Sequence, residues 1–161
     1  PRNDYARFSL AILYQKIGQL SQAKEIYYKI LKSDPDNKEE IISNLLSIMI
    51  DESPRDAVYV LSRLLTQNPE SSYIYAQSAI AYDKLNDHEN AIRMLKRAII
   101  LAPNKVDYQY NLAVIYDKKG DYREALGNYF NALKGLDSSD ESQIAFINQI
   151  RSRIQSIKSI L

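Results

Sequence analysis

The residues best suited to chemistry in this chain are few and lie apart. His88 is the only histidine, and it stands between Asp87 and Glu89. A metal centre or a general base needs further ligands or reacting groups close by, and one histidine among scattered acids is weak support for either. We therefore interpret His88 as a side chain that packs across a helical hairpin. We predict no metal site and no cofactor.

Two other patterns match ligand sites only in part. The segment 34–37, Asp-Pro-Asp-Asn, looks like the start of a calcium loop, but the glycine and the later glutamate of such a loop are missing. The glycines, at positions 18, 120, 127 and 135, are too scattered to form a phosphate-binding loop. The chain has no cysteine, which excludes disulfides and thiol nucleophiles. The sequence therefore predicts a protein that is not an enzyme.

The composition narrows the classes of partner. The 161 residues include 21 Lys and Arg against 20 Asp and Glu, without the basic excess typical of nucleic-acid binders. No apolar run approaches the roughly 20 residues that span a bilayer, so we expect no membrane insertion. The chain begins at Pro1 without methionine, which we interpret as a fragment or a processed product. The compartment stays open, with the cytoplasm slightly favoured.

The elements that would position any site follow from an internal period of 34 residues. Such a period is the signature of a repeat architecture. Within each period the apolar residues follow helical spacing in two segments that are separated by a turn. The five series that carry the period are Pro35, Pro69 and Pro103; Ala23, Ala57, Ala91 and Ala125; Tyr14, Ile48, Tyr82 and Tyr116; Tyr27, Leu61, Leu95 and Tyr129; and Leu31, Leu65, Ile99 and Leu133.

Capping and turn residues mark the ends of these helices. Each proline of the period falls just after a second helix, where it blocks further helical turns. A capping side chain followed three residues later by an acid predicts a helix start. The predicted pairs are Asn37 with Glu40, Asn104 with Asp107, Asp121 with Glu124, and Ser138 with Glu141.

The stretch from Tyr110 to Ala125 resembles the tetratricopeptide repeat, in Tyr-Asn-Leu-Ala at its start and Lys-Gly-Asp-Tyr-Arg-Glu-Ala at its end. The resemblance implies an all-α fold, a right-handed superhelical array of antiparallel helix pairs. It places four repeats at 4–37, 38–71, 72–105 and 106–139. Residues 140–161 then form a C-terminal capping helix on the same domain.

The resemblance also implies that first-helix residues in certain phases line a concave groove. An exposed apolar strip of this kind typically marks an interaction surface, here for a partner helix or an extended apolar segment. The alternative is that the chain's own tail, or a tighter closure of the array, covers the strip. The expected groove residues are Tyr5, Phe8, Ile12, Ile42, Leu46, Met49, Tyr73, Gln77, Ile80, Tyr110, Asn111 and Val114, with Gln15, Ser43, Asp83 and Asp117 as further polar members.

Two features depart from the family pattern. Some relatives clamp the carboxylate at the C-terminus of heat-shock chaperones, but the matching positions here lack the basic groups, so we do not expect that activity. These positions are Phe8, Ile12, Ser43, Tyr73 and Gln77. In addition, the turn of the second repeat has Glu52 where the other repeats have Gly18, Asn86 and Gly120, which predicts a locally changed helix crossing.

The last helix carries an isoleucine stripe and is expected to extend past the neighbouring helix. Capping of the array is its expected main role, whereas Ile154, Ile157 and Leu161 are candidate contacts with another copy.

The leading functional hypothesis is a protein–protein interaction module, a scaffold, adaptor or assembly chaperone. The alternatives are an array that self-assembles through its N-terminal repeat and C-terminal helix, or a regulatory arm of a larger enzyme.

Overall fold

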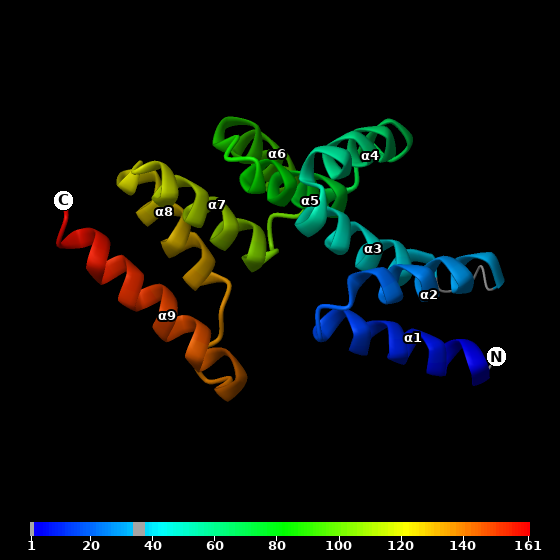
Figure 1. The fold of residues 1–161 in the computed structure, drawn as a ribbon. Helices are drawn as coiled ribbons and strands as arrows, with labels where there is room; N and C mark the ends of the chain where they lie inside the picture. The colour runs from blue at the N-terminus through cyan, green and yellow to red at the C-terminus, as the bar shows by residue number, and fades with distance from the viewer. Residues whose placement is uncertain (1, 34–37) are drawn as a thin grey trace. The chain divides into compact units, whose positions relative to one another are not determined.

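The computed structural model describes residues 2–33 and 38–161, and every regular element among them is an α-helix (Figure 1). The all-α class expected from the sequence is therefore confirmed. The chain divides into two compact units, Pro1–Ala57 (unit 1) and Val58–Leu161 (unit 2). The helices are α1 (Arg2–Lys16), α2 (Leu20–Ser33), α3 (Lys38–Glu52), α4 (Pro54–Gln67), α5 (Ser72–Lys84), α6 (His88–Leu101), α7 (Val106–Lys119), α8 (Tyr122–Lys134) and α9 (Glu141–Lys158).

Three helical hairpins close through the same turn. Gly18, Asn86 and Gly120 hold the left-handed conformation, with φ of 77°, 58° and 82°. Glycine adopts this region without strain, and asparagine tolerates it. The residue after each one donates its amide to a tyrosine carbonyl in the first helix, at 2.9 Å in all three cases. These bonds run from Gln19 to Tyr14, from Asp87 to Tyr82 and from Asp121 to Tyr116.

The second hairpin turns differently. Helix α3 continues to Glu52 and α4 begins at Pro54, so a single residue separates them. The amide of Ser53 donates to the carbonyl of Met49 at 2.8 Å, the α-helical pattern of bonding. Glutamate is poorly suited to the left-handed region, and proline is well suited to the first helical position. The changed helix crossing that we expected here stays a prediction.

Two of the capping pairs predicted from the sequence are wrong. At α7 the residue before the helix is Lys105, and Asn104 lies inside a turn closed by the Lys105 amide and the Ala102 carbonyl at 3.2 Å. At α9 the cap is Asp140, whose carboxylate accepts the Ser142 amide at 2.9 Å. Ser138 lies inside the preceding turn, so it is too far from the helix to cap it.

The remaining pairs have other outcomes. Asp121 stands at the start of α8 as predicted, but its side chain makes no capping hydrogen bond. At α6, for which no capping pair was predicted, the Asp87 carboxylate caps the helix by accepting the Asn90 amide at 3.2 Å. Asn37 and Pro35 lie outside the described residues.

Each unit has its own apolar core. In unit 1, Ala11 and Ala23 are fully buried beside Tyr27 and Ile41. In unit 2 the alanines of the period again lie fully buried, among aliphatic residues of α6, α7 and α9. Small side chains let antiparallel helices approach closely, which explains why alanine recurs at these positions.

No helix in residues 2–33 and 38–161 combines the length and apolar character needed to cross a membrane.

Candidate functional site

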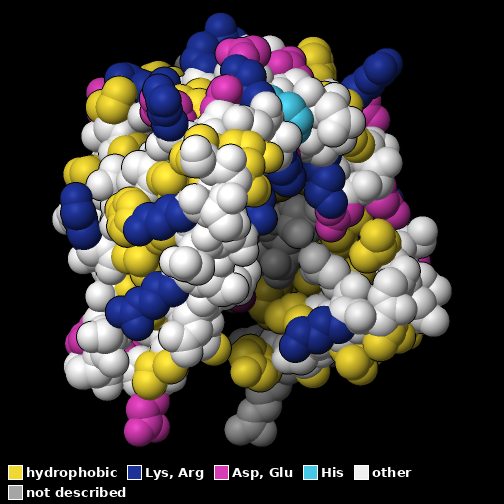
Figure 2. Space-filling model, turned by 90° about the vertical axis from the view of Figure 1, so that its left-hand side faces the viewer, with side chains coloured by type: hydrophobic (Ala, Val, Ile, Leu, Met, Phe, Trp, Pro, Cys, Tyr) yellow, Lys and Arg dark blue, Asp and Glu magenta, His cyan; other side chains and the backbone are white. Residues whose placement is uncertain are grey.

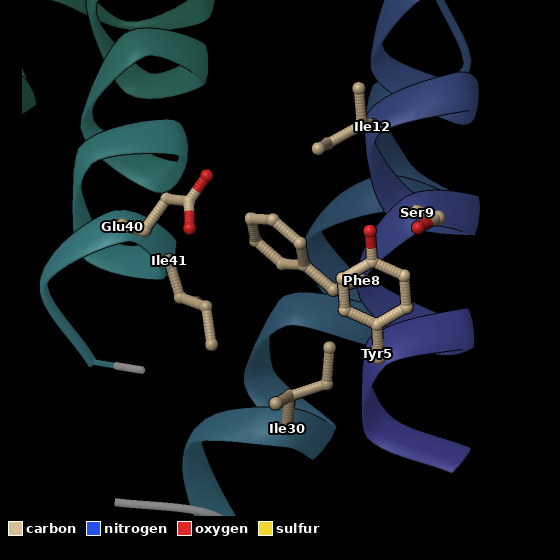
Figure 3. Close-up of a pocket in the computed structure, with 7 residues that line it drawn as sticks. All are labelled: Tyr5, Phe8, Ser9, Ile12, Ile30, Glu40 and Ile41. Carbon is tan, nitrogen blue, oxygen red and sulfur yellow. The ribbon is translucent and has the colours of Figure 1, made fainter. Parts of the chain in front are cut away.

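A pocket in unit 1 gathers three of the side chains predicted to line the groove. Tyr5, Phe8 and Ile12 of α1 line it, and the side chains of Phe8 and Ile12 project toward the start of α3 (Figure 3). The pocket has a volume of about 330 Å³, at the small end of the range for ligand sites. Its complete lining is Tyr5, Phe8, Ser9, Ile12, Ile30, Glu40 and Ile41.

Helical spacing and close helix packing create this pocket. Residues 5, 8 and 12 share one face of α1, because three- and four-residue steps complete a turn. Phe8 also packs against Tyr27 of α2, with ring centroids 5.9 Å apart. The Tyr27 hydroxyl donates to Gln15 at 3.1 Å, and burial raises the pKa of this hydroxyl. The α2 side of the pocket is therefore anchored to the unit 1 core.

The rim of the pocket is open and mixed in character. The Tyr5 side chain is 78% exposed, so its ring is accessible to a partner. Ser9 and Glu40 are also exposed and supply a hydroxyl and a carboxylate. The pocket therefore combines aliphatic and aromatic walls with polar groups that can orient a partner's backbone or a basic side chain.

Helix α3 follows the prediction only in part. Ile42 is exposed and Met49 and Ser43 are half-buried, so these side chains remain accessible. Leu46 differs, because it is only 3% exposed. The prediction that Leu46 is exposed in the groove is therefore wrong. Helix α3 is apolar on nearly all sides, and a helix of this kind is buried on more than one side.

In unit 2 the expected groove residues lie on α5 and α7. Tyr73 is exposed, and Gln77 and Ile80 are half-buried on α5. On α7, Asn111 and Val114 are half-buried, and Val114 packs against the unit 2 core.

Tyr110 is occupied by the chain's own C-terminal helix. Its ring meets the Phe146 ring edge-on at 4.8 Å, and its hydroxyl accepts a hydrogen bond from Gln149 at 3.0 Å. The prediction that Tyr110 lines an open groove is therefore wrong. The alternative that the tail covers the strip holds at this position.

An ion pair fixes α9 against α7. The Arg153 guanidinium donates two hydrogen bonds to Asp117, each 2.6 Å long, and the Tyr129 hydroxyl donates a third at 3.1 Å. The bonds from Arg153, more than that from Tyr129, hold the pKa of Asp117 below its usual range. Burial, with the Asp117 charge, raises the pKa of Tyr129. Asp117 is therefore a structural carboxylate rather than an accessible groove residue.

The isoleucines of α9 do not overhang. Ile154 and Ile157 are buried in the unit 2 core, so they were wrongly expected to be free for contacts with another copy. Leu161 is exposed, beside the start of α8. On the face drawn in Figure 2, hydrophobic side chains lie in patches with Lys and Arg between them.

Comparison with known proteins agrees with the repeat that the sequence period indicates. Two family models described as tetratricopeptide repeat match residues 5–37 and 77–141.

The chain belongs to the tetratricopeptide repeat family.

Relatives in this family are longer than the chain. A TPR repeat-containing protein of Methanocaldococcus jannaschii is 29% identical over 85% of this chain and 26% of the relative. DnaJ homolog subfamily C member 3 of Gallus gallus is 24% identical over 96% of this chain and 33% of the relative. The chain thus spans about a quarter to a third of these proteins.

Solved structures share the tetratricopeptide repeat fold. MamA of Desulfovibrio magneticus superposes with a TM-score of 0.63 at 19% identity, over 81% of this chain and 74% of MamA. The type III secretion translocator chaperone SycD of Yersinia enterocolitica gives a TM-score of 0.64 at 15% identity, over 74% of this chain and 85% of SycD. Family and fold together support a protein–protein interaction module.

In the third tetratricopeptide repeat, His88 lies against Asp83 across the hairpin, with Nδ1 3.3 Å from the carboxylate. Lys118 of the fourth repeat pairs with the other oxygen of Asp83. Within the described ranges, no group of three potential metal ligands comes together.

Reasoning from the repeat period missed part of the site. Ile30 and Ile41 line the pocket but were not among the predicted groove residues, and Glu40 was assigned to a helix cap. Phe146, Gln149 and α9's Arg153 lie after the last period, so no phase rule applied to them. The aromatic and amide side chains of α9 were the available signal.

Proposed function

We propose that this chain binds a protein partner through the unit 1 pocket, as a scaffold, adaptor or assembly chaperone segment. The partner inserts an apolar side chain of a helix or extended segment between α1 and α3. The observation that carries the proposal is the pocket lined by Tyr5, Phe8 and Ile12. Ile42, which follows the pocket residue Ile41 along α3, is exposed. The half-buried Met49 gives the same helix an adaptable apolar side chain.

The chemistry of the pocket favours binding over catalysis. Its polar members are Ser9 and Glu40, together with the phenol of Tyr5. A hydroxyl without a neighbouring base is a weak nucleophile, whereas these groups suit hydrogen bonds to a peptide. Glu40 favours a partner with Lys or Arg next to its apolar anchor.

The unit 1 site is favoured over the last repeat. At Tyr110 and Asp117 the corresponding surface already holds α9. Self-assembly through Ile154 and Ile157 loses its basis, because both side chains are buried.

Two neighbouring residues provide a matched test. Ile12 lines the pocket, whereas Leu13 is exposed on another face of α1. The Ile12→Glu and Leu13→Glu variants add the same charge one residue apart. A partner is captured from source lysate with the wild-type chain, and its affinity for each variant is measured by titration.

We expect Ile12→Glu to weaken binding at least tenfold, roughly 1.4 kcal/mol, because it places a charge in an apolar pocket. Leu13→Glu should retain wild-type affinity, and circular dichroism should show equal helix content. Loss of binding in Leu13→Glu alone would overturn the pocket assignment.

A further inference from the structure

The fourth repeat has a glycine that helix packing does not require. Gly127 lies in the interior of α8, where only proline is less favourable to the helix than glycine. A Cβ on Gly127 would meet no atom of a neighbouring helix within 4 Å, so close packing does not exclude a side chain. In the three earlier repeats the same phase holds longer, exposed side chains, which are Glu25, Tyr59 and Arg93.

Gly127 lies in the wall of a second pocket, which is built by α6, α7 and α8 of unit 2. This pocket has a volume of about 480 Å³, within the range of ligand sites. At Gly127 the α8 wall is bare backbone, so the glycine leaves open the space that a longer side chain would enter. We call this space the Gly127 pocket.

The base of the Gly127 pocket is apolar. Leu112 and Tyr116 of α7 line it and are nearly buried. Ile99 and Ile100 of α6 also belong to the lining, and Ile100 is 68% exposed. An apolar side chain of a partner would therefore find aliphatic and aromatic contacts here, and it would cover an isoleucine that otherwise faces water.

Two helices of the pocket carry opposite charges. Lys96 on α6 and Glu124 on α8 are both exposed members of the lining. Within residues 2–33 and 38–161 neither of them forms an ion pair, and the Lys96 ammonium lies over the Tyr116 ring, 5.8 Å from its centroid. Gln109 and Asn128 add side-chain amides, which suit hydrogen bonds to a peptide backbone.

We propose that the Gly127 pocket binds a protein segment in which one apolar side chain lies between an acidic and a basic residue. The apolar side chain enters the space beside Gly127 and contacts Leu112 and Tyr116. The acid of the segment pairs with Lys96 and its base pairs with Glu124, so the two charges fix the direction of the segment. This site is separate from the unit 1 pocket and does not depend on it.

The experiment selects short random peptides on the whole chain from a displayed library. The library is first depleted on the Gly127→Leu variant, which removes peptides that bind elsewhere. Arg93→Leu is the matched control, because it adds the same leucine one period earlier, outside the pocket lining. Lys96→Glu is compared with Arg97→Glu, since Arg97 is exposed next to Lys96 and outside the lining.

We expect the enriched peptides to share a Leu, Ile, Met or Phe with an acid on one side and a base on the other. Their dissociation constants, measured by fluorescence anisotropy, should rise at least about tenfold in Gly127→Leu and stay unchanged in Arg93→Leu, because only the first leucine fills the pocket. Lys96→Glu should weaken binding, and replacing the acid of the peptide by lysine should restore it. Arg97→Glu should have no effect.

Controls separate this site from folding and from the unit 1 pocket. Leucine favours a helix more than glycine does, so the melting temperature of Gly127→Leu should equal or exceed that of wild type. Ile12→Glu should bind the enriched peptides as wild type does, so failure of either site gives its own result. Absence of enriched peptides, wild-type affinity in Gly127→Leu or unchanged affinity in Lys96→Glu would overturn the proposal.

Discussion

At the scale of single residues, Asp117 shows how a repeat position changes its role. By phase it was expected at the polar edge of a groove. Instead its carboxylate accepts three hydrogen bonds, two from Arg153 and one from Tyr129. A carboxylate that is mostly shielded from water needs such partners, because an unpaired buried charge is costly.

This contact makes part of the stability dependent on pH. The pKa of Asp117 is lowered in the folded chain, chiefly by Arg153. Its contribution is therefore complete above the unfolded pKa and is lost as pH falls through the folded pKa. We expect Asp117→Asn to lower the free energy of unfolding by about 1–2 kcal/mol at pH 7, since Arg153 is partly exposed.

Urea unfolding of wild type and Asp117→Asn at several pH values checks this. The difference in the free energy of unfolding between wild type and Asp117→Asn should become smaller as pH falls below about 5, toward the folded pKa of Asp117. Other carboxylates with lowered pKa values are present in both proteins, so their effects cancel in the difference. A gap that stays constant with pH would contradict the assigned role of Asp117.

At the scale of elements, α9 acts as an additional first helix stacked on the fourth repeat. Its Ile150, Ile154 and Ile157 are buried in the unit 2 core, and Phe146 and Gln149 contact Tyr110. Its exposed residues include Asn148, Arg151 and Gln155, so its outer face is largely polar, and its role as a capping helix stays a prediction.

A buried and an exposed isoleucine near the end of the chain provide a test of how α9 packs. Ile157 is fully buried and Ile160 is 56% exposed. We expect Ile157→Ala to lower the free energy of unfolding by about 2–4 kcal/mol, because it leaves a cavity in the core. Ile160→Ala should change it by less than about 0.5 kcal/mol. Equal effects in urea unfolding would show that α9 is not docked as described.

The sequence period predicted the hairpins well because each repeat packs two antiparallel helices with the same kinds of residue at the same positions. Alanines fix the close approaches, and Gly18, Asn86 and Gly120 fix the turns. Helix starts were less predictable, because neighbouring polar residues such as Asp140 and Ser138 compete for the cap. The side chains that α9 brings to Tyr110 lie beyond the last period, so the period could not assign them to this contact.

The candidate site was predictable only where its residues stand on one helix. Tyr5, Phe8 and Ile12 follow from spacing along α1. Leu46 has the same phase, but α3 is apolar all round and buries it. A phase rule cannot choose which face of such a helix remains exposed.

At the scale of the whole molecule, the two units differ in what they leave accessible. In unit 2, α9 covers Tyr110 of the last repeat. In unit 1, α1 lines the pocket on one face and exposes Leu10, Leu13 and Ile17 on another. We infer that, of the two first helices, only α1 receives the partner's apolar side chain, although the same repeat builds both units.

Photo-crosslinking from the pocket tests this account most directly. A benzoylphenylalanine replaces Tyr5 at the pocket rim or, as a control, Tyr28, which is exposed on α2 outside the pocket lining. Irradiation in source lysate should join one discrete protein to position 5 and leave position 28 without it, and Ile12→Glu should remove the product. Equal crosslinking of that protein from both positions, or a product at position 5 that persists with Ile12→Glu, would contradict partner binding in the pocket.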